Sequence, residues 1–219
     1  GLNISDKKIC VGKHRVLMSG FRDYVLEKYV NKIVENNYTA VVYSQDEKAA
    51  GTTRSLDGIY SPGTFFNSES NAITNNSVCI WLQKHKDQLI TGMTNIDIFT
   101  GKSYMFEHQD QFSKHCTSYD ELERFISIYN PSEVIIIHNL EDRLINNIIN
   151  FASIKTECIH KININETTAL SEKANNCEKQ IYQKQIVEKF YNHSELSQNF
   201  NFYNYPIATQ SLCFLLEFI

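Results

Sequence analysis

The sequence predicts an α/β protein with two modules: a small mixed α/β module, followed by a larger one in which helices flank a mixed sheet. Three observations predict this class. Residues 76–138 hold three apolar runs, an amphipathic helix and a fourth apolar run. Residues 66–76 are polar and rich in Asn and Ser, which is typical of a linker. The residues before this linker show short strand patterns around one helix, which indicates a separate module.

Three strands are predicted at the start of the larger module, at Ser77–Gln83, Leu89–Phe99 and Ser103–His108. The second and third are joined by a tight-turn sequence in which Gly101 supplies a positive φ. A phosphate-binding loop at Gly101-Lys102-Ser103 is not expected, because the glycine that such a loop needs five positions earlier is Ile96. These runs therefore predict strands linked by hairpins.

A helix and a buried strand follow. Apolar residues recur at helical spacing up to Tyr129, and the helix should end at Asn130, because a residue before proline is disfavoured in the helical region. Glu133–Ile137 is apolar on both faces, which is typical of a central parallel strand. Beyond it we predict helices at 140–151 and 169–191, the latter broken near Cys177, an edge strand at Ile154–Ile159 and a last helix after Pro206.

The first module is predicted to hold a helix over Phe21–Glu35, ending at Asn36-Asn37. Its strand candidates are residues 2–4, 16–18, 38–43 and 56–60, and residues 61–64 form a turn. The last helix of the chain has no cap and no stop signal, so we expect a fragment of a larger protein.

Composition narrows the class of protein. The 219 residues are 42% hydrophobic, and no run approaches the roughly 20 apolar residues that span a bilayer. No basic and apolar leader is seen, so we expect an intracellular, non-secreted protein with no membrane partner, in the cytoplasm, an organelle or a virus factory or virion. The six cysteines form no CxxC pair, and Cys79 and Cys213 lie in apolar elements, which predicts buried reduced thiols.

Charge is distributed unevenly along the chain. The net charge is −4, but residues 1–66 carry nine Lys and Arg against seven Asp and Glu, and the remainder carries twelve against eighteen. Because affinity for nucleic acid comes from Lys and Arg, any DNA contact should lie in the first third. The candidate phosphate contacts are Lys7, Lys8, Lys13, Arg15 and Arg54, and the alternative is that they are solvated surface charge.

A catalytic site is not expected. The predicted strand order resembles ribonuclease H, whose type of two-metal site needs converging carboxylates, yet the first strand of the block has none. Asp97 is expected to be a hydrogen-bonding turn residue beside Thr100 and Gly101, and Asp120 and Glu133 are not expected to converge on it. His108, His115 and Cys116 are expected to be loop residues, and His138 a solvated histidine at a strand end.

A series of motifs, in order, resembles the N-terminal part of the DNA mismatch-repair protein family MutS. The matching segments are Gly20–Tyr24 leading a helix, Val41–Gln45, Arg54–Tyr60 into Ser61-Pro62-Gly63-Thr64, Ile96–Gly101, and Asn130-Pro131-Ser132-Glu133-Val134. The Asn-, Ile- and Lys-rich composition suits the viral and organellar branch of that family.

The resemblance implies a partial mismatch-recognition module at residues 1–68 and a connector domain with a ribonuclease-H-like fold at 69–219. The family's Phe-x-Glu wedge would precede Leu2, and Gly58 replaces a family arginine. The implied role is non-catalytic: contact with duplex DNA, and relay to a MutL-like protein and a MutS-like partner subunit. ATP and magnesium would be bound only by an ATPase domain beyond Ile219, so no cofactor is expected here. The alternatives are a metal-dependent nuclease or resolvase using Asp97, and a pure protein-interaction module.

Overall fold

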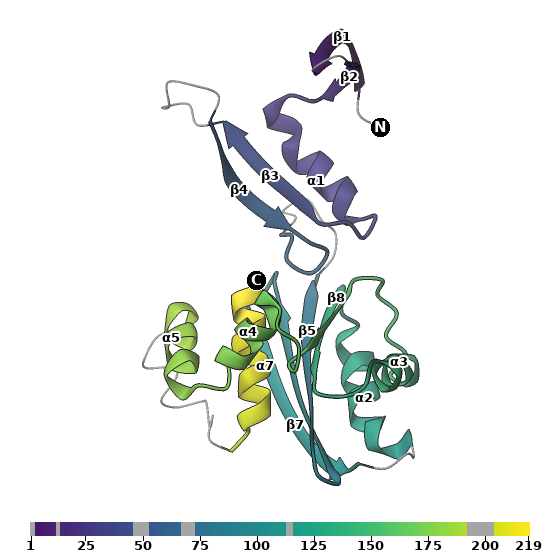
Figure 1. The fold of residues 1–219 in the computed structure, drawn as a ribbon, viewed down its shortest axis with the longest axis vertical. Coiled ribbons are helices and arrows are strands. Elements are labelled where there is room, and N and C mark those ends of the chain that lie inside the picture. The colour runs from purple at the N-terminus through teal and green to yellow at the C-terminus, as the bar shows by residue number, and fades with distance from the viewer. Residues whose placement is uncertain (1–2, 12–13, 46–52, 67–72, 113–115, 192–203) are drawn as a thin grey trace. The chain divides into compact units, whose positions relative to one another are not determined.

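The computed structural model describes residues 3–11, 14–45, 53–66, 73–112, 116–191 and 204–219. Their contacts divide the chain into two compact units, residues 1–61 and 62–219. The division falls seven residues before the boundary at residues 68 and 69 that the resemblance implies. Each unit is described by itself below (Figure 1).

The first unit contains two separate two-stranded antiparallel sheets and a helix. Its elements are β1 (Asn3–Val11), β2 (His14–Gly20), the 3-10 turn η1 (Asp23–Val25), α1 (Leu26–Val34), β3 (Ala40–Gln45) and β4 (Arg54–Tyr60). The helix therefore begins five residues later than the periodicity predicts, because the chain first forms the 3-10 turn. It ends as expected, with Asn37 in the left-handed region at φ 62°.

The second unit is built on a five-stranded sheet of order β7-β6-β5-β8-β9. The strands are β5 (Asn76–His85), β6 (Gln88–Asp97), β7 (Ser103–Gln111), β8 (Glu133–His138) and β9 (Ile159–Asn163). The β5–β6 and β6–β7 pairs are antiparallel, whereas β5–β8 and β8–β9 are parallel. This mixed sheet has the strand order of ribonuclease H, which confirms the predicted fold class.

Helices cover both faces of this sheet (Figure 1): α4 (Ala169–Asn176), α5 (Gln180–Phe190) and α7 (Pro206–Phe218) lie on one side, and α2 (Asp120–Tyr129) and α3 (Asp142–Phe151) on the other. Alternate residues of β5 and β8 accordingly enter different cores. Trp81 and Ile137 belong to the core beneath α7, and Ile80 and Ile136 to the core beneath α2 and α3. All six residues of β8 are buried, as expected of a central parallel strand.

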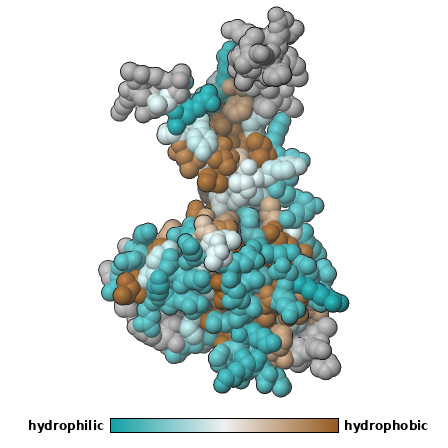
Figure 2. Space-filling view, viewed as in Figure 1, coloured by the Kyte–Doolittle hydropathy of each residue, from teal (hydrophilic) through white to brown (hydrophobic). Residues whose placement is uncertain are grey.

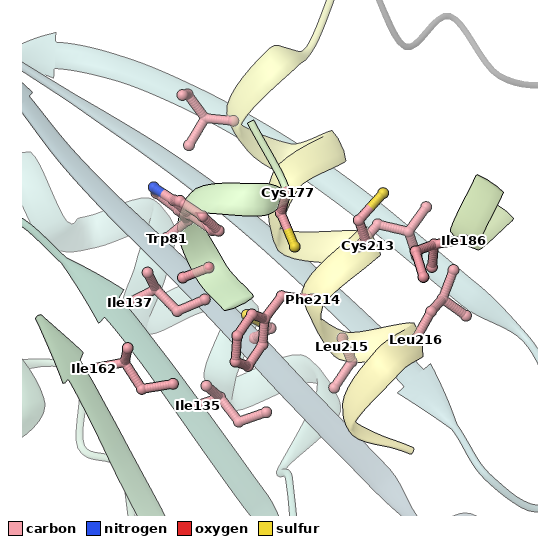
Figure 3. Packing of buried hydrophobic residues seen from close by; sticks show 14 of the residues in the cluster. Trp81, Ile135, Ile137, Ile162, Cys177, Ile186, Cys213, Phe214, Leu215 and Leu216 are labelled. Carbon is pink, nitrogen blue, oxygen red and sulfur yellow. The ribbon is translucent and has the colours of Figure 1, made fainter. Parts of the chain in front are cut away.

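The core beneath α7 contains buried thiols. Cys79, Cys177 and Cys213 are free and fully buried, and Figure 3 shows Cys177 and Cys213 beside Phe214 and Ile186. Burial raises the pKa of the Cys79 thiol to about 12, although a hydrogen bond with Ser211 opposes the shift. Such a thiol stays protonated and unreactive at neutral pH, and the burial predicted for Cys79 and Cys213 is confirmed.

Helix α7 approaches the sheet closely at two points on β6 and β7. A Cβ atom at Gly92 would lie 2.5 Å from the backbone nitrogen of Ala208, so only glycine fits beneath the helix. The carboxylate of Glu107 accepts hydrogen bonds from the N–H groups of Ile207 and Ala208, at 2.8 and 2.9 Å. A carboxylate at this end of a helix satisfies unpaired N–H groups and opposes the positive end of the helix dipole.

Two helix boundaries follow the sequence expectations. α2 ends at Asn130, which adopts the left-handed conformation at φ 41° before Pro131. The predicted long helix is broken near Cys177 into α4 and α5. The side chain of Thr168 caps α4 by accepting a hydrogen bond from the N–H of Ser171.

One expectation for the C-terminal half was wrong. The strand predicted at Ile154–Ile159 begins only at Ile159, because Ser153 takes a left-handed turn and Thr156 bonds to the carbonyl of Ser132. Along α5, Ile186 and Val187 are buried, whereas Ile181 is 76% exposed. Among the described residues, no helix has the length and apolar character needed to cross a membrane.

Candidate nucleic-acid interface

The predicted phosphate contacts all belong to the first unit. Lys7 and Lys8 lie on β1, Arg15 on β2, and Arg54 begins β4, where it is exposed and pairs with Gln45. The side chains of Lys7, Lys8 and Arg15, and all of Lys13, lie outside the described part of the chain. Arg54 is therefore the one candidate whose side-chain exposure the structure reports.

A β-bulge shapes the surface beside Arg54. Val41 lies opposite Ile59, but the register shifts between Val42 and Tyr43, so that Tyr43 lies opposite Leu56. Because directly opposed residues share a face, the shift places Leu56 and Ile59 on one face although they are three residues apart. These four side chains, which we call the β3–β4 apolar face, are each between 52% and 59% exposed.

The other side of this ribbon is partly covered by α1. Within residues 20–45 and 53–61, whose burial the structure describes, the buried apolar residues are Val30 and Val34 of α1 and Ala40 of β3. Phe21 stacks on Tyr29 with ring centroids 4.4 Å apart, and the ammonium of Lys32 lies 5.8 Å from the Tyr29 ring. Figure 2 shows hydrophobic surface among the side chains of this unit. This described part of the first unit thus combines few buried apolar side chains with exposed apolar and basic ones.

Gly58 is the position at which the family arginine is absent. A Cβ atom there would lie 2.7 Å from the hydroxyl of Tyr60, so the Tyr60 ring occupies the space above the glycine. A longer side chain would fit only after that ring moved.

Asp97 was expected to be a hydrogen-bonding turn residue, and this is confirmed. It accepts a hydrogen bond from the Thr100 hydroxyl at 2.6 Å and others from the N–H groups of Asn75 and Phe99, at 2.9 and 3.1 Å. Burial alone would raise the pKa of Asp97, but these hydrogen bonds hold it below the usual value. Gly101, at φ +69°, closes the predicted hairpin turn.

The expectations for His138 and His108 were wrong. His138 was expected to be solvated, but only 1% of it is exposed, and its Nδ1 atom lies 3.1 Å from the Leu140 carbonyl oxygen. Burial lowers the pKa of His138, although the hydrogen bond with the Leu140 carbonyl opposes this shift. His108 lies within β7 rather than in a loop, Cys116 begins a 3-10 turn, and His115 is outside the described residues. No three His, Cys, Asp or Glu side chains of the described part gather closely enough to hold a metal ion.

Sequence reasoning did not find the role of Glu133, a carboxylate at the start of β8 that is only 1% exposed. Its Oε1 atom lies 2.6 Å from Nε2 of His160, and its Oε2 atom accepts a hydrogen bond from the N–H of Gly63 at 2.9 Å. The Ser77 hydroxyl donates to the Gly63 carbonyl at 2.6 Å. These bonds fix the turn at Pro62–Thr64 onto the sheet of the second unit. The available sequence signal was an acidic residue at the start of an apolar run, shortly after Asn130-Pro131.

The sequence of the chain is similar to those of known proteins. The family model "MutS domain I" matches residues 1–69. A DNA mismatch repair protein MutS of Caldanaerobacter subterraneus is 30% identical over 127 residues. The chain is similar in sequence to MutS proteins. This confirms the resemblance drawn from the ordered motifs.

The aligned segment of that relative covers 56% of this chain and 14% of the relative. A MutS homologue of Acanthamoeba polyphaga mimivirus is 23% identical over 138 residues, or 59% of this chain and 12% of its own length. The MutS protein of Clostridioides difficile is 28% identical over 133 residues, 59% of this chain and 13% of the relative. The MutS-like chain thus spans about an eighth of the length of these proteins.

Among solved structures, the Fowlpox virus Holliday junction resolvase matches 64% of this chain and 96% of its own, with 14% identity and a TM-score of 0.36. The same resolvase in complex with Holliday junction DNA gives a TM-score of 0.37 over 64% of this chain and 95% of the resolvase. A likeness at this level carries no functional argument.

Proposed function

We propose that the chain is the DNA-contacting and relaying N-terminal part of a MutS-like mismatch-repair protein, without catalytic activity of its own. The observation that carries the proposal is the coincidence of two features in one unit. Residues 1–61, which contain all the predicted phosphate contacts, carry nine Lys and Arg against seven Asp and Glu, and the MutS domain I match covers this same unit.

In this proposal the first unit sits on the phosphate backbone of duplex DNA. Backbone contacts position a protein without reading sequence, and mismatched steps bend and unstack more readily than paired ones. Arg54 and the basic residues of β1 and β2 supply the contacts. The wedge that would test base stacking is assigned to sequence before Leu2.

The second unit is proposed as the connector between DNA, an ATPase domain and partner proteins. Its sheet is covered on both faces, which suits a body that moves without deforming. With twelve Lys and Arg against eighteen Asp and Glu, it suits protein partners better than nucleic acid. The partners proposed are a MutL-like protein and a MutS-like subunit. ATP and magnesium are assigned to a domain outside these 219 residues.

The nuclease alternative lacks a supporting observation in the second unit. β5 carries no carboxylate, and both oxygens of Asp97 accept hydrogen bonds, one from Thr100 and the other from Phe99 and Asn75. Glu133 is likewise engaged by Gly63 and His160. These partners favour a structural role for both acids.

The proposal is tested by titrating the chain with matched and mismatched duplexes at about 50 mM and about 200 mM salt. We expect weak binding that falls steeply with salt and does not distinguish the duplexes. Arg54→Glu should weaken binding several-fold and flatten the salt dependence. The matched control is Lys184→Glu, which reverses an exposed charge on α5 of the second unit and should leave binding unchanged.

Equal loss of affinity in both variants would contradict the placement of DNA on the first unit. A clear preference for the mismatched duplex at this chain length would contradict the assignment of the wedge to upstream sequence.

A further inference from the structure

One edge of the five-stranded sheet is formed by β7, a nine-residue strand. No backbone hydrogen bond of the described residues reaches the outer side of this strand between Ser103 and Gln109. Among the described residues this edge is unpaired, and a long unpaired edge with few charges can pair with another strand.

The direction of the free backbone groups follows from one hydrogen bond. The N–H of Asp97 donates to the carbonyl of Lys102 at 3.0 Å, and these two residues are opposed in the β6–β7 register. Because hydrogen-bonded pairs alternate along an antiparallel ladder, the even-numbered residues of β7 bond to β6. The odd-numbered residues, from Ser103 to Gln109, therefore direct their N–H and carbonyl groups outward.

The even-numbered side chains form an aromatic row on one face of this edge. Tyr104 is 46% exposed and Phe106 41% exposed. The rings of Phe106 and His108 are nearly parallel, with centroids 6.5 Å apart, and Tyr104 lies 5.5 Å from Tyr129 of α2. The row thus stands beside an unpaired strand edge, so an added strand could extend it.

We propose that β7 pairs antiparallel with β7 of a second copy of this chain, with Phe106 opposite the partner's Phe106, joining two five-stranded sheets into one. A two-fold axis perpendicular to the sheet keeps faces matched, so opposed residues must both be even or both be odd. In this register Tyr104 faces His108 of the partner subunit, and the outward groups of Ser103 and Gln109 bond to each other across the axis.

Charge favours this strand register over the one centred on Glu107. Centring on Phe106 places Lys102 opposite Asp110 of the partner subunit, once on each side of the axis. Centring on Glu107 would oppose two carboxylates directly, which is destabilising. Phe106 falls on a pair without hydrogen bonds, where Cα atoms approach to about 4.5 Å and side chains pack most closely. A nucleic-acid occupant is disfavoured, because Glu107 and Asp110 lie on the strand and the unit is net acidic.

The first test uses the charge at the axis. Sedimentation of the full 219-residue chain over a range of concentrations should show a weak monomer–dimer equilibrium, as expected of an interface below about 1,200 Å². Phe106→Lys and Phe106→Glu should each raise the dissociation constant about tenfold, since the aromatic pair is lost and like charges meet. An equimolar mixture of the two variants should recover dimers, because Lys then faces Glu. Far-UV circular dichroism checks that both variants fold.

The second test removes a single outward donor. Gln109→Pro deletes the N–H that the register uses, on the side away from β6, where a strand tolerates proline. Gln109→Ala loses the same side chain but keeps the N–H. We expect the proline variant to be monomeric and the alanine variant to dimerise like the native chain.

The proposal is overturned if the native chain stays monomeric at millimolar concentration, or if the mixed Lys and Glu variants remain monomeric. It is also overturned if a native dimer persists unchanged in Gln109→Pro. Binding of a single-stranded oligonucleotide or an unrelated extended peptide to β7, in a chain that does not self-associate, would assign the edge to another occupant.

Discussion

The two sheets of this chain that are best described differ in how they are covered. In the second unit, helices lie on both faces of the five-stranded sheet, and every residue of β8 is buried. In the first unit, the β3–β4 ribbon has α1 on one side, and its other face presents four large apolar side chains to solvent. The same kinds of β-branched and aromatic residues therefore serve as core in one unit and as surface in the other.

The difference indicates that the second unit contributes most of the stability of the chain, whereas the first carries side chains that can contact a ligand. Full burial of a large apolar side chain is worth about 2 to 3 kcal/mol, and the second unit has many such side chains whereas the described part of the first has few. The first unit instead holds the excess of basic residues. We infer that the second unit holds its shape independently of ligands, and that the first is available for binding. Three experiments sharpen or break this contrast.

The largest effect is expected from truncating matched aromatic residues in the two units. Phe214→Ala removes a fully buried ring from α7 and should lower the free energy of unfolding by about 4 kcal/mol. Tyr43→Ala removes a ring that is 59% exposed and should change it by no more than about 0.5 kcal/mol. Urea unfolding followed by far-UV circular dichroism measures both. Comparable losses would show that the β3–β4 apolar face is covered in solution.

A smaller effect is expected from adding one methyl group to a glycine in each unit. Gly92→Ala places a Cβ atom 2.5 Å from the Ala208 backbone nitrogen, so α7 must shift, at a cost of roughly 2 to 3 kcal/mol. Gly20→Ala meets no atom within 4 Å and should change stability by less than about 1 kcal/mol. Trp81, the one tryptophan of the chain, is buried beneath α7, and its fluorescence reports unfolding of the second unit. An unchanged Trp81 transition in Gly92→Ala would contradict the close approach of the helix.

The smallest effect is a pH dependence confined to the second unit. Burial lowers the pKa of His138 from its ordinary value of 6.5. The folded state therefore favours the neutral imidazole, and its contribution to stability is complete above pH 6.5 and is lost as pH falls below that value. His138→Asn should make Trp81-monitored stability less dependent on pH between about 7 and 5. A variant with the same slope as the native chain would show that His138 does not carry this dependence.

Local patterns predicted most of the second unit. Apolar runs located β5, β6, β7 and β8, Asn-Pro located the end of α2, and the Thr-Gly turn located the β6–β7 hairpin. The strand at Ile154–Ile159 was misplaced, because the left-handed turn at Ser153 has no strong sequence signal. The relation to MutS followed from motif order.

The contacts that depend on distant residues were not predictable. Glu107 meets the N-terminus of α7 about a hundred residues later, and Glu133 meets Gly63 seventy residues earlier. His138 is buried, although its place after the apolar run of β8 predicted a solvated strand end. The basic candidates stay predictions, since only Arg54 has a described side chain.

The bond between Gly63 and Glu133 has a practical consequence for dividing the gene. A clone that starts at residue 69 would omit Gly63 and take one hydrogen-bond donor from a carboxylate that is 1% exposed. A clone that starts at Pro62 would keep that donor, together with the Gly63 carbonyl that accepts from Ser77. Expression of the isolated second unit should therefore begin at Pro62, so that the purified product retains both hydrogen bonds of Gly63.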